Sequence, residues 1–335
     1  MTDTTTETEP VEDGYHKRIS VAASPATVFA LLTEPERLRR WQSVVSSVDL
    51  EVGGEYRHLV VPGAVARGRF TEIEPDRRLV YTWGWEGETA GVAPGSSTVS
   101  VVLSPDGDRT IIDFTHDGLP DAEAVTSHAD GWNHFVDRLA TAAEKGDAGP
   151  DPWAAGPEDM DLVGVAEASL ALMLDQLRSV SPDDPERATP CAAFTLAELV
   201  DHLVGSLGMI AISGGGTAVA PSADAAVECR VADAAAAALT AWRRRGLDGE
   251  VDFGGGSVPA QVPIAVAVAE LFVHAWDVAQ VTGRPFDPAG HVVVMADGAV
   301  RGVIPPDRGD SFGPPLPEEG LDPVGALMAF TGRIV

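Results

Sequence analysis

The chain has 335 residues, of which 44% are apolar, so it is long enough for two globular domains and too long for one ordinary hydrophobic core. Its formal net charge of −28 argues against binding to nucleic acid or to an anionic membrane surface. Only two cysteines are present, which excludes a disulfide framework and favours a reducing cytoplasm, and no long apolar stretch lacks polar interruption, so no transmembrane helix is expected.

The first 14 residues, MTDTTTETEPVEDG, are acidic and rich in threonine, and they lack the basic and apolar segments of a signal peptide. We expect residues 1–14 to form a disordered acidic tail. Residues 15–146 contain short segments in which apolar and polar residues alternate. Turn residues separate these segments, and the pattern predicts strands. The expected strands are YHKRISV, SVDLEV, EYRHLVV, ARGRFTEIEPDRRLVYTWGW, STVSVVLSP and RTIIDFTHDG.

Short helices after the first strand and one long helix at the end are expected in the same half of the chain. The segment SPATVFALLTEPERLRRW has Ser24 as an N-cap and Pro25 at the first helical position. Residues 122–145 repeat apolar side chains at helical spacing. This order of elements predicts an α+β fold in which an antiparallel sheet surrounds one long C-terminal helix.

The segments ASPATVFALLTEPERLRRW, GGEYR, RFTEIEPDRRLVYTW and HADGWNHFVDRL resemble the START-like (SRPBCC) superfamily, and within it the branch named for activators of the heat-shock-protein ATPase. The resemblance implies that residues 15–146 form a helix-grip domain that binds a small apolar ligand. Six aromatic side chains of this half are candidates either for the lining of a ligand cavity or for the core: Trp41, Tyr81, Trp83, Trp85, Phe114 and Trp132.

Residues 147–159 are rich in glycine, proline and aspartate, which predicts a linker. From residue 160 to residue 335 the pattern becomes helical. The expected helices are LVGVAEASLALMLDQLRSV, TLAELVDHLVGSLGMIAIS, VADAAAAALTAWRRRG and IAVAVAELFVHAWDVAQVTG, with PVGALMAFTGR as a short fifth. Four helices joined by long loops predict an all-α four-helix bundle. The glycine-rich segments SGGGT and FGGGS lack the Lys-Ser/Thr sequence of a phosphate loop.

The fourth of these helices is apolar on almost every side, yet it carries Glu270, His274 and Asp277 on one stripe. Buried carboxylates and imidazoles are costly unless they are paired or bound to a metal. Glu270 and His274 are four residues apart, so their side chains lie one above the other and can hold one ion. A buried Glu–His pair without metal is the alternative. Asp277 either orients a metal ligand or pairs with an arginine.

The second helix carries His202 at the margin of its apolar face. Glu198 stands four residues before it, but Thr195-Leu-Ala-Glu198 is a capping box, which gives Glu198 a local structural role. His202 therefore needs a partner from elsewhere, and the stripe on the fourth helix is the simplest one. Cys191, which follows Pro190, is a candidate for a thiol of low pKa, although a packing role is favoured.

The segments TPCAAFTLAELVDHL, ELFVHAWDVAQVTGRP and ALMAFTGR are similar to the actinobacterial metal-binding branch of the DinB four-helix superfamily, which includes mycothiol-dependent maleylpyruvate isomerase and several thiol S-transferases. The metal ligands of that family correspond to His202, Glu270 and His274. The resemblance implies a divalent metal, with zinc preferred and nickel or iron as alternatives, and it suggests a low-molecular-weight thiol such as mycothiol as a cofactor. That isomerase has a further C-terminal domain that helps to bind the thiol, whereas this chain ends at Val335. The sequence therefore leaves open whether a thiol cofactor is used.

These observations favour an enzyme that depends on a divalent metal and acts on a small organic molecule by thiol-dependent S-transfer or isomerisation. Three ligands leave coordination positions open, so metal-bound water or a thiolate is the expected catalytic group. The START-like domain would bind an apolar substrate. The alternatives are a non-enzymatic small-molecule-binding or sensor protein, and a START-like cyclase-type catalyst in secondary metabolism with the metal bundle as an accessory. The sequence leaves the oligomeric state open.

Overall fold

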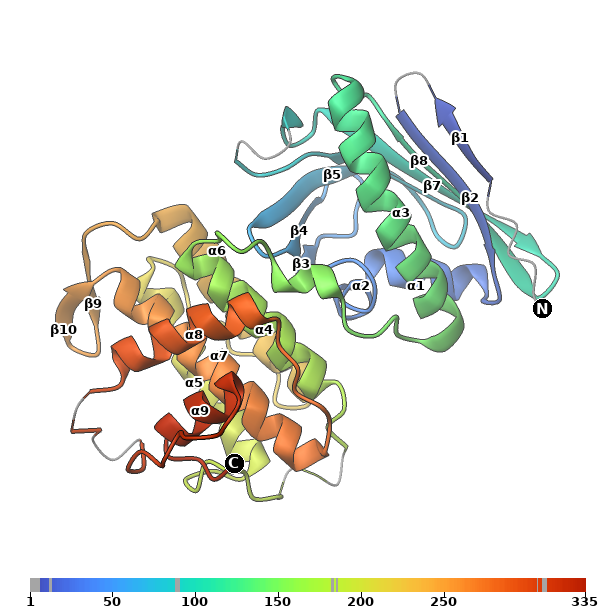
Figure 1. Cartoon of the computed structure of the whole chain (residues 1–335). Helices are drawn as coiled ribbons and strands as arrows, with labels where there is room; N and C mark the ends of the chain where they lie inside the picture. The colour runs from blue at the N-terminus through green and yellow to red at the C-terminus, as the bar shows by residue number, and fades with distance from the viewer. Residues whose placement is uncertain are drawn as a thin grey trace. The chain divides into compact units, whose positions relative to one another are not determined.

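The computed structural model describes residues 7–11, 14–87, 91–181, 184, 186–305, 307–308 and 312–335. The chain divides into two compact units, Met1–Asp151 and Pro152–Val335, which we call the N-terminal and the C-terminal domain (Figure 1). The division falls inside the segment 147–159, for which a linker is predicted.

An eight-stranded antiparallel sheet forms the frame of the N-terminal domain. Its order is β1-β2-β8-β7-β6-β5-β4-β3. The strands are β1 (Glu7–Val11), β2 (Gly14–Val21), β3 (Val45–Val48), β4 (Glu55–Val61), β5 (Ala64–Glu74), β6 (Arg78–Trp83), β7 (Ser97–Asp106) and β8 (Arg109–Asp117). Among the described residues, α1 and α2 lie between β2 and β3 and α3 follows β8, so the expected α+β architecture is confirmed for this domain.

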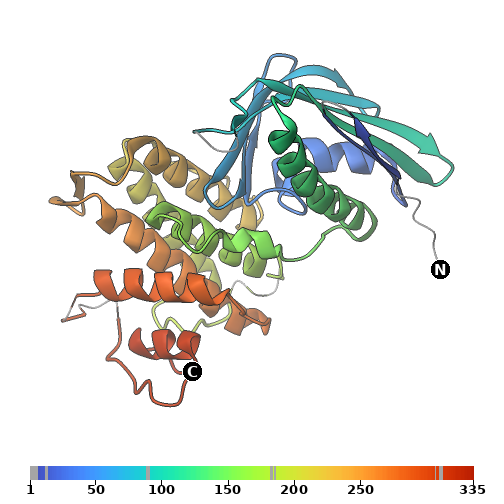
Figure 2. The same cartoon turned by 45° about the horizontal axis from the view of Figure 1, so that its top comes forward.

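The long helix α3 (Ala122–Lys145) lies along one face of the curved sheet (Figures 1 and 2). It begins at Asp121, whose side chain accepts a hydrogen bond from the amide of Ala124. The segment over residues 24–41, where short helices are expected, forms α1 (Pro25–Thr33) and α2 (Pro35–Leu38). The break between the two helices has a physical cause, because a residue that precedes proline is disfavoured in helical conformation and Glu34 is extended.

Two expectations for this domain were wrong in detail. Residues 7–11 lie within the expected disordered tail, yet they form β1, which pairs with the edge of β2. Backbone pairing at a sheet edge does not require apolar side chains, so composition could not indicate it. The strand expected over residues 47–52 is β3, which ends at Val48, and Leu50 and Val52 are exposed in the turn that follows. The other residues of the expected tail apart from Gly14 lie outside the described residues.

Five of the six aromatic residues considered as cavity lining contact one another in the core between the sheet and α3, and Trp41 belongs to the same core. Trp132 lies 4.5 Å from Phe114 and 5.0 Å from Trp83, measured between ring centroids. Trp41, Tyr81, Trp83, Phe114 and Trp132 are buried, and Trp85 packs against them partly exposed. These side chains therefore take part in the packing of the core.

Two histidines next to this cluster are held neutral by indole donors. Because an indole nitrogen can only donate, the bond from Trp132 Nε1 to His116 Nδ1 (2.9 Å) leaves the ring proton of His116 on Nε2, which donates to Ser97 Oγ (2.8 Å). In the same way Trp85 Nε1 donates to Nε2 of His128 (3.0 Å). Each imidazole would have to give up an indole hydrogen bond to accept a second proton.

We expect the N-terminal domain to lose stability as the pH falls below about 6.5, the pKa of an unperturbed histidine. Burial lowers the pKa of His58 and of His116 to about 3. Between pH 6.5 and pH 3 these histidines are therefore protonated in the unfolded chain and neutral in the folded domain. Each histidine should lower the free energy of unfolding by up to about 1.4 kcal/mol per pH unit. Urea unfolding of the full chain between pH 7.5 and 5 measures this slope. In His116→Gln the difference in bound protons between the unfolded and folded states should be smaller by about one, so the slope should fall by up to about 1.4 kcal/mol per pH unit. An unchanged slope would contradict the view that His116 is neutral in the folded domain.

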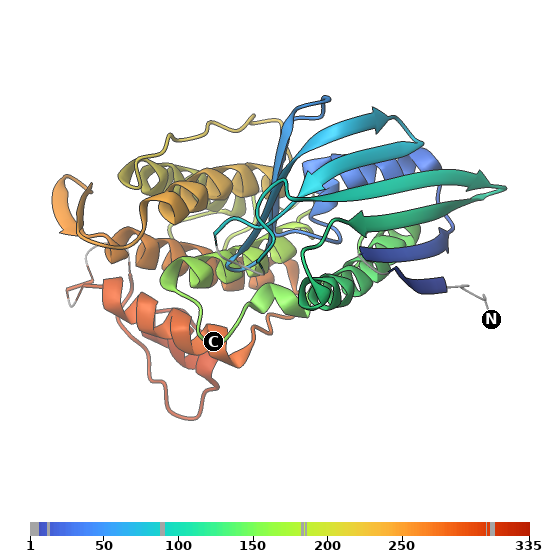
Figure 3. The ribbon, with the colours of Figure 1, turned by 90° about the horizontal axis from the view of Figure 1, so that it is seen from above.

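The C-terminal domain is a helical bundle around α7 (Gln261–Thr282), which packs against α4 (Leu162–Leu177), α5 (Leu196–Ser213) and α8 (Gly290–Val303) (Figure 3). The remaining elements are the short 3-10 helix η2 (Pro152–Ala155), α6 (Val227–Arg245), β9 (Glu250–Phe253), β10 (Gly256–Pro259) and α9 (Pro323–Phe330). The four longest expected helices correspond to α4, α5, α6 and α7, and the short fifth corresponds to α9.

Two elements of the C-terminal domain were not expected. The helix α8 has the sequence GHVVVMADGAVRGV, whose glycines and β-branched residues have low helix propensity, and it is held by burial of Val292, Ala296 and Val300. The segment FGGGS forms the turn of the β9–β10 hairpin, where Gly254 and Gly255 both have positive φ (66° and 84°), as a two-residue hairpin turn requires. The bundle therefore contains more than the four helices expected.

Among the described residues, α5 and α7 are long and apolar enough to cross a membrane by length and composition. The apolar window of α7 is 78% buried inside the domain and that of α5 is 50% buried. Core helices of soluble bundles meet the same criterion, so these two helices are weak evidence for a membrane span.

Candidate metal centre

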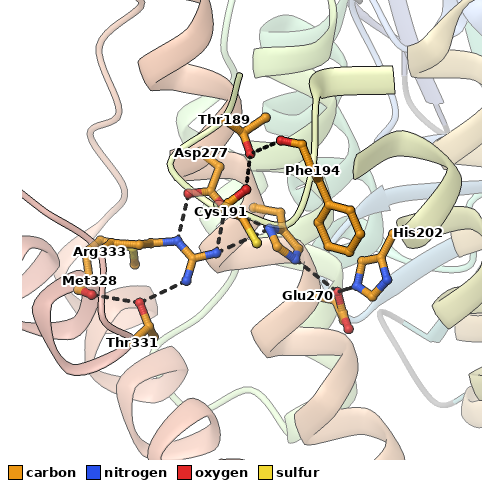
Figure 4. Close-up of polar contacts among 10 residues, drawn as sticks. Thr189, Cys191, Phe194, His202, Glu270, Asp277, Met328, Thr331 and Arg333 are labelled. Carbon is orange, nitrogen blue, oxygen red and sulfur yellow. Dashed lines mark hydrogen bonds and ion pairs between the residues drawn. The ribbon is translucent and has the colours of Figure 1, made fainter. Parts of the chain in front are cut away.

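Helices α5 and α7 bring three metal-ligating side chains together. His202 lies on α5, and Glu270 and His274 lie one turn apart on α7. Nε2 of His202 is 2.9 Å from Oε2 of Glu270, and Nε2 of His274 is 3.3 Å from the same oxygen. One ligand atom from each residue lies within 4.8 Å of the other two, and within the described part of the chain no other such group occurs. Figure 4 shows Glu270 and His202 facing each other.

These separations fit a divalent ion. Protein nitrogen and oxygen ligands bind such ions at about 2.0–2.2 Å, which places neighbouring ligand atoms about 3.0–3.5 Å apart in octahedral or tetrahedral geometry. The two measured separations lie at or near this range. The residues present therefore suit a metal by donor type and by spacing.

Asp277 determines which nitrogen of His274 is free. Its Oδ2 lies 2.8 Å from Nδ1 of His274, and an ionised carboxylate can only accept, so Nδ1 carries a proton and Nε2, which faces Glu270, is the nitrogen that could bind an ion. Arg333 binds the same carboxylate with two nitrogens, at 2.7 Å to Oδ1 and 2.6 Å to Oδ2. The sequence left open whether Asp277 orients a ligand or pairs with an arginine, and in the structure it contacts both.

The electrostatics of the cluster favour a cation. Burial by itself would raise the pKa of Glu270, but hydrogen bonds to His202 and His274 outweigh burial and hold that pKa at about 2. Burial opposes a charge on His274, yet its hydrogen bonds to Asp277 and Glu270 raise its pKa. With neutral imidazoles, the charges of Glu270, Asp277 and Arg333 leave one net negative charge, which a divalent ion or an imidazolium offsets.

The loop before α5 covers the His202 side of the centre. The ring of Phe194 stacks on that of His202, with 4.8 Å between centroids and 25° between planes (Figure 4). Thr189 Oγ1 lies 2.9 Å from the carbonyl oxygens of both Cys191 and Phe194, and its single hydroxyl hydrogen, shared between them, holds the loop. Burial raises the pKa of the Cys191 thiol, so the low-pKa candidate was wrong and Cys191 is a neutral thiol at pH 7.

Glu198 is not part of this centre. It forms the expected capping box: its carboxylate accepts from the amide of Thr195 (2.8 Å), and the Thr195 hydroxyl accepts from the amide of Glu198 (3.4 Å). The local role assigned to Glu198 is confirmed. The helix does supply a second polar contact, since Ser206, four residues after His202, donates to Oε1 of Glu270 (3.3 Å).

Sequence reasoning missed Phe194, Ser206 and Arg333. Ser206 could have been found, because it lies one turn after His202 on the same face of α5. Arg333 ends the segment ALMAFTGR, which was noted only as part of a resemblance. Nothing in the spacing along the chain links Phe194 to the ring of His202, since the stacking depends on the path of a loop.

Residues 22–144 match the family described as "Activator of Hsp90 ATPase homolog 1-like protein". The N-terminal domain is therefore similar to AHSA1-like domains of the START/SRPBCC type and has a helix-grip fold, as the resemblance of residues 15–146 implied. The match does not extend into the C-terminal domain, where the DinB-like assignment stays a prediction.

Two uncharacterized proteins of Mycobacterium tuberculosis, from strains CDC 1551 and H37Rv, are each 29% identical over 176 residues, which is 51% of this chain and 94% of theirs. Among solved structures, an AHSA1-like protein from Rhizobium etli is 40% identical, with 46% of this chain and 92% of that protein covered and a TM-score of 0.36. CalU16 from Micromonospora echinospora is 25% identical, with 48% and 86% covered and a TM-score of 0.37. DynU16, a putative protein in the dynemicin biosynthetic locus, is 25% identical, with 42% and 49% covered and a TM-score of 0.37, so the similarity spans about half of DynU16.

Proposed function

We propose that the chain is a cytoplasmic, divalent-metal-dependent enzyme that acts on a small organic molecule by thiol-dependent S-transfer or isomerisation. The observation that carries the proposal is the convergence of His202, Glu270 and His274 from two helices, with Nε2 of His274 facing Glu270. Zinc is the preferred ion, and nickel or iron are alternatives, because two imidazoles and one carboxylate suit all three.

The chain's own residues define what such a centre can do. Three protein ligands leave positions for a substrate group, and a bound ion would supply Lewis acidity that lowers the pKa of a water or thiol. Phe194 stacks its apolar ring on that of His202 and so covers one face of this imidazole. Asp277 keeps His274 in the tautomer that can bind.

The thiol would come from outside the chain. Cys191, the cysteine near the centre, has a raised pKa and is protonated at neutral pH, so it is a poor nucleophile. A low-molecular-weight thiol such as mycothiol, entering the open coordination positions, is the source that we propose. The family resemblance of residues 160–335 to thiol S-transferases supports this choice.

The AHSA1-like domain would bind the apolar substrate. Trp83 Nε1 is buried within the aromatic core, and the described part of the chain provides no acceptor for it. A buried donor without a partner costs about 1–3 kcal/mol. A ligand with a carbonyl or other acceptor oxygen at this point would remove that cost, which favours an apolar molecule with one acceptor over a plain hydrocarbon.

The second candidate is a non-enzymatic small-molecule-binding or sensor protein. It is favoured by His116 and His128, since their indole-bound nitrogens are unavailable for acid–base work in the N-terminal domain. The same observation argues against a cyclase-type catalyst in that domain. In this alternative the metal bundle would act as a sensor or structural partner.

Metal content and cobalt spectroscopy test the proposal. The purified protein without a histidine tag should contain about one divalent ion per chain. After substitution with cobalt, mycothiol or a simpler thiol should produce a thiolate-to-cobalt absorption band. A metal-containing protein that shows no band would favour metal-assisted hydrolysis or the binding role, and a protein without metal would overturn the enzyme proposal.

A further inference from the structure

The last residues of the chain form a turn that requires its particular sequence. After α9, Gly332 has a φ of +87°, and a Cβ atom on it would lie 2.9 Å from the Cα of Gly313. Both facts require glycine at this position. The amides of Gly332 and Arg333 donate to the carbonyls of Ala329 and Met328, both at 3.0 Å. The turn reverses the chain and directs Arg333 into the bundle.

The Arg333 side chain is fully engaged where it enters. It is 6% exposed, and its Nε and Nη2 bind both oxygens of Asp277. Its Nη1 donates to Thr331 Oγ1 (3.1 Å), and that hydroxyl donates to the carbonyl of Met328 (2.7 Å). Figure 4 shows this path from the end of α9 to Asp277. The segment Thr331-Gly332-Arg333 therefore connects the end of α9 to Asp277, whose carboxylate binds the ring of His274.

We propose that Arg333 is a positioning residue for the metal centre, which acts through Asp277 on the ring of His274. This inference rests on the proposed function, because it assigns the C-terminal turn to the same centre. Stability alone does not explain the buried Arg333–Asp277 ion pair, since apolar residues of similar volume often stabilise a buried site as much as an ion pair does. An apolar pair could not accept the Nδ1 proton of His274, whereas the anchored carboxylate accepts it in one orientation.

Substitutions at Arg333 should weaken metal binding in a graded way. Loss of a hydrogen-bond partner behind a metal-binding histidine costs about 10–100-fold in metal affinity. Arg333→Met leaves Asp277 as the partner of His274 and removes only its anchor, so it should lose metal affinity at the lower end of this range, about tenfold. Arg333→Lys, which keeps the charge but not both hydrogen bonds to Asp277, should lose less. The affinity is measured by competition with a chromophoric zinc chelator. The cobalt-substituted variants should also show altered d–d spectra, because the orientation of one ligand has changed.

Arg243 in the same domain offers a matched control. It binds the buried carboxylate of Glu167 with two nitrogens, at 2.9 and 2.7 Å, and it contacts no residue of the metal centre. Arg243→Met and Arg243→Lys should lower the thermal unfolding temperature without a change in zinc affinity or in the cobalt spectrum. An equal loss of affinity in the Arg243 and Arg333 variants would mean that Arg333 acts only through stability.

The outcomes separate this inference from the proposed function. A wild-type protein without metal defeats both. A wild-type protein that binds zinc, with Arg333→Met equal to it in affinity and cobalt spectrum, overturns the positioning role and leaves the proposed function intact. If Arg333→Met does not fold, Arg333→Lys decides: a folded Lys variant with unchanged affinity and spectrum contradicts the inference, and a shifted spectrum supports it.

Discussion

Replacement of His202, Glu270 or His274 by alanine should each remove the metal, from about one ion per chain to less than about a tenth. The three ligands come from two helices, and the loss of one leaves a two-ligand site that competes poorly with water and buffer. The effect should be similar for all three, because each supplies one ligand atom to the same cluster. Elemental analysis of the tag-free variants after dialysis against a weak chelator measures it.

Glu198→Ala is the matched control for Glu270→Ala. Glu198 stands four residues before His202, as Glu270 stands four residues before His274, yet it caps α5 and faces away from the cluster. This variant should keep its metal and lose about 1 kcal/mol of stability, the usual value of an N-terminal cap. Retention of metal in the His274 variant would show that the cluster is a buried polar network. The enzyme proposal would then lose its only candidate for a catalytic group.

The parts of the fold that follow from local pattern could be predicted. Most strands of the N-terminal sheet show a period of two residues and the helices α3 to α6 a period of 3.6, and cap or turn residues mark most of their ends. The helix α8 could not be found in this way, since glycines and valines give it little intrinsic helicity and packing supplies the rest. The strand β1 owes its conformation to backbone pairing with β2, which its acidic composition does not show.

The same distinction applies to the site. The pairing of Glu270 with His274 is a matter of helical spacing, and the capping box of Glu198 left His202 without a local partner, so both steps could be made from the sequence. The contact between Arg333 and Asp277 joins residues 56 positions apart, and only the course of the last turn creates it. Contacts that depend on the path of a loop cannot be predicted from hydrophobic periodicity or from the spacing of residues along the chain.

Replacement of Trp132 by alanine should strongly destabilise the N-terminal domain. Trp132 is 3% exposed and its ring contacts those of Phe114 and Trp83. Truncation of a buried tryptophan costs about 3–5 kcal/mol through lost contacts and the cavity that remains. It also leaves Nδ1 of His116 without its donor. Since a domain is stable by only about 5–15 kcal/mol, this variant should unfold at a markedly lower urea concentration.

Two further variants show whether Trp132 is core or cavity wall. Trp132→Phe keeps most of the ring volume but removes the donor to His116, so it should cost about 1–3 kcal/mol. Val52→Ala, at a side chain that is 65% exposed in the same domain, should change stability by no more than about 0.5 kcal/mol. Urea unfolding followed by circular dichroism measures all three. If Trp132→Ala costs no more than Val52→Ala, the indole is not part of the packed core. Such a result would mean that it borders a space already open to ligand, and the apolar-ligand role of the domain would gain its first direct support.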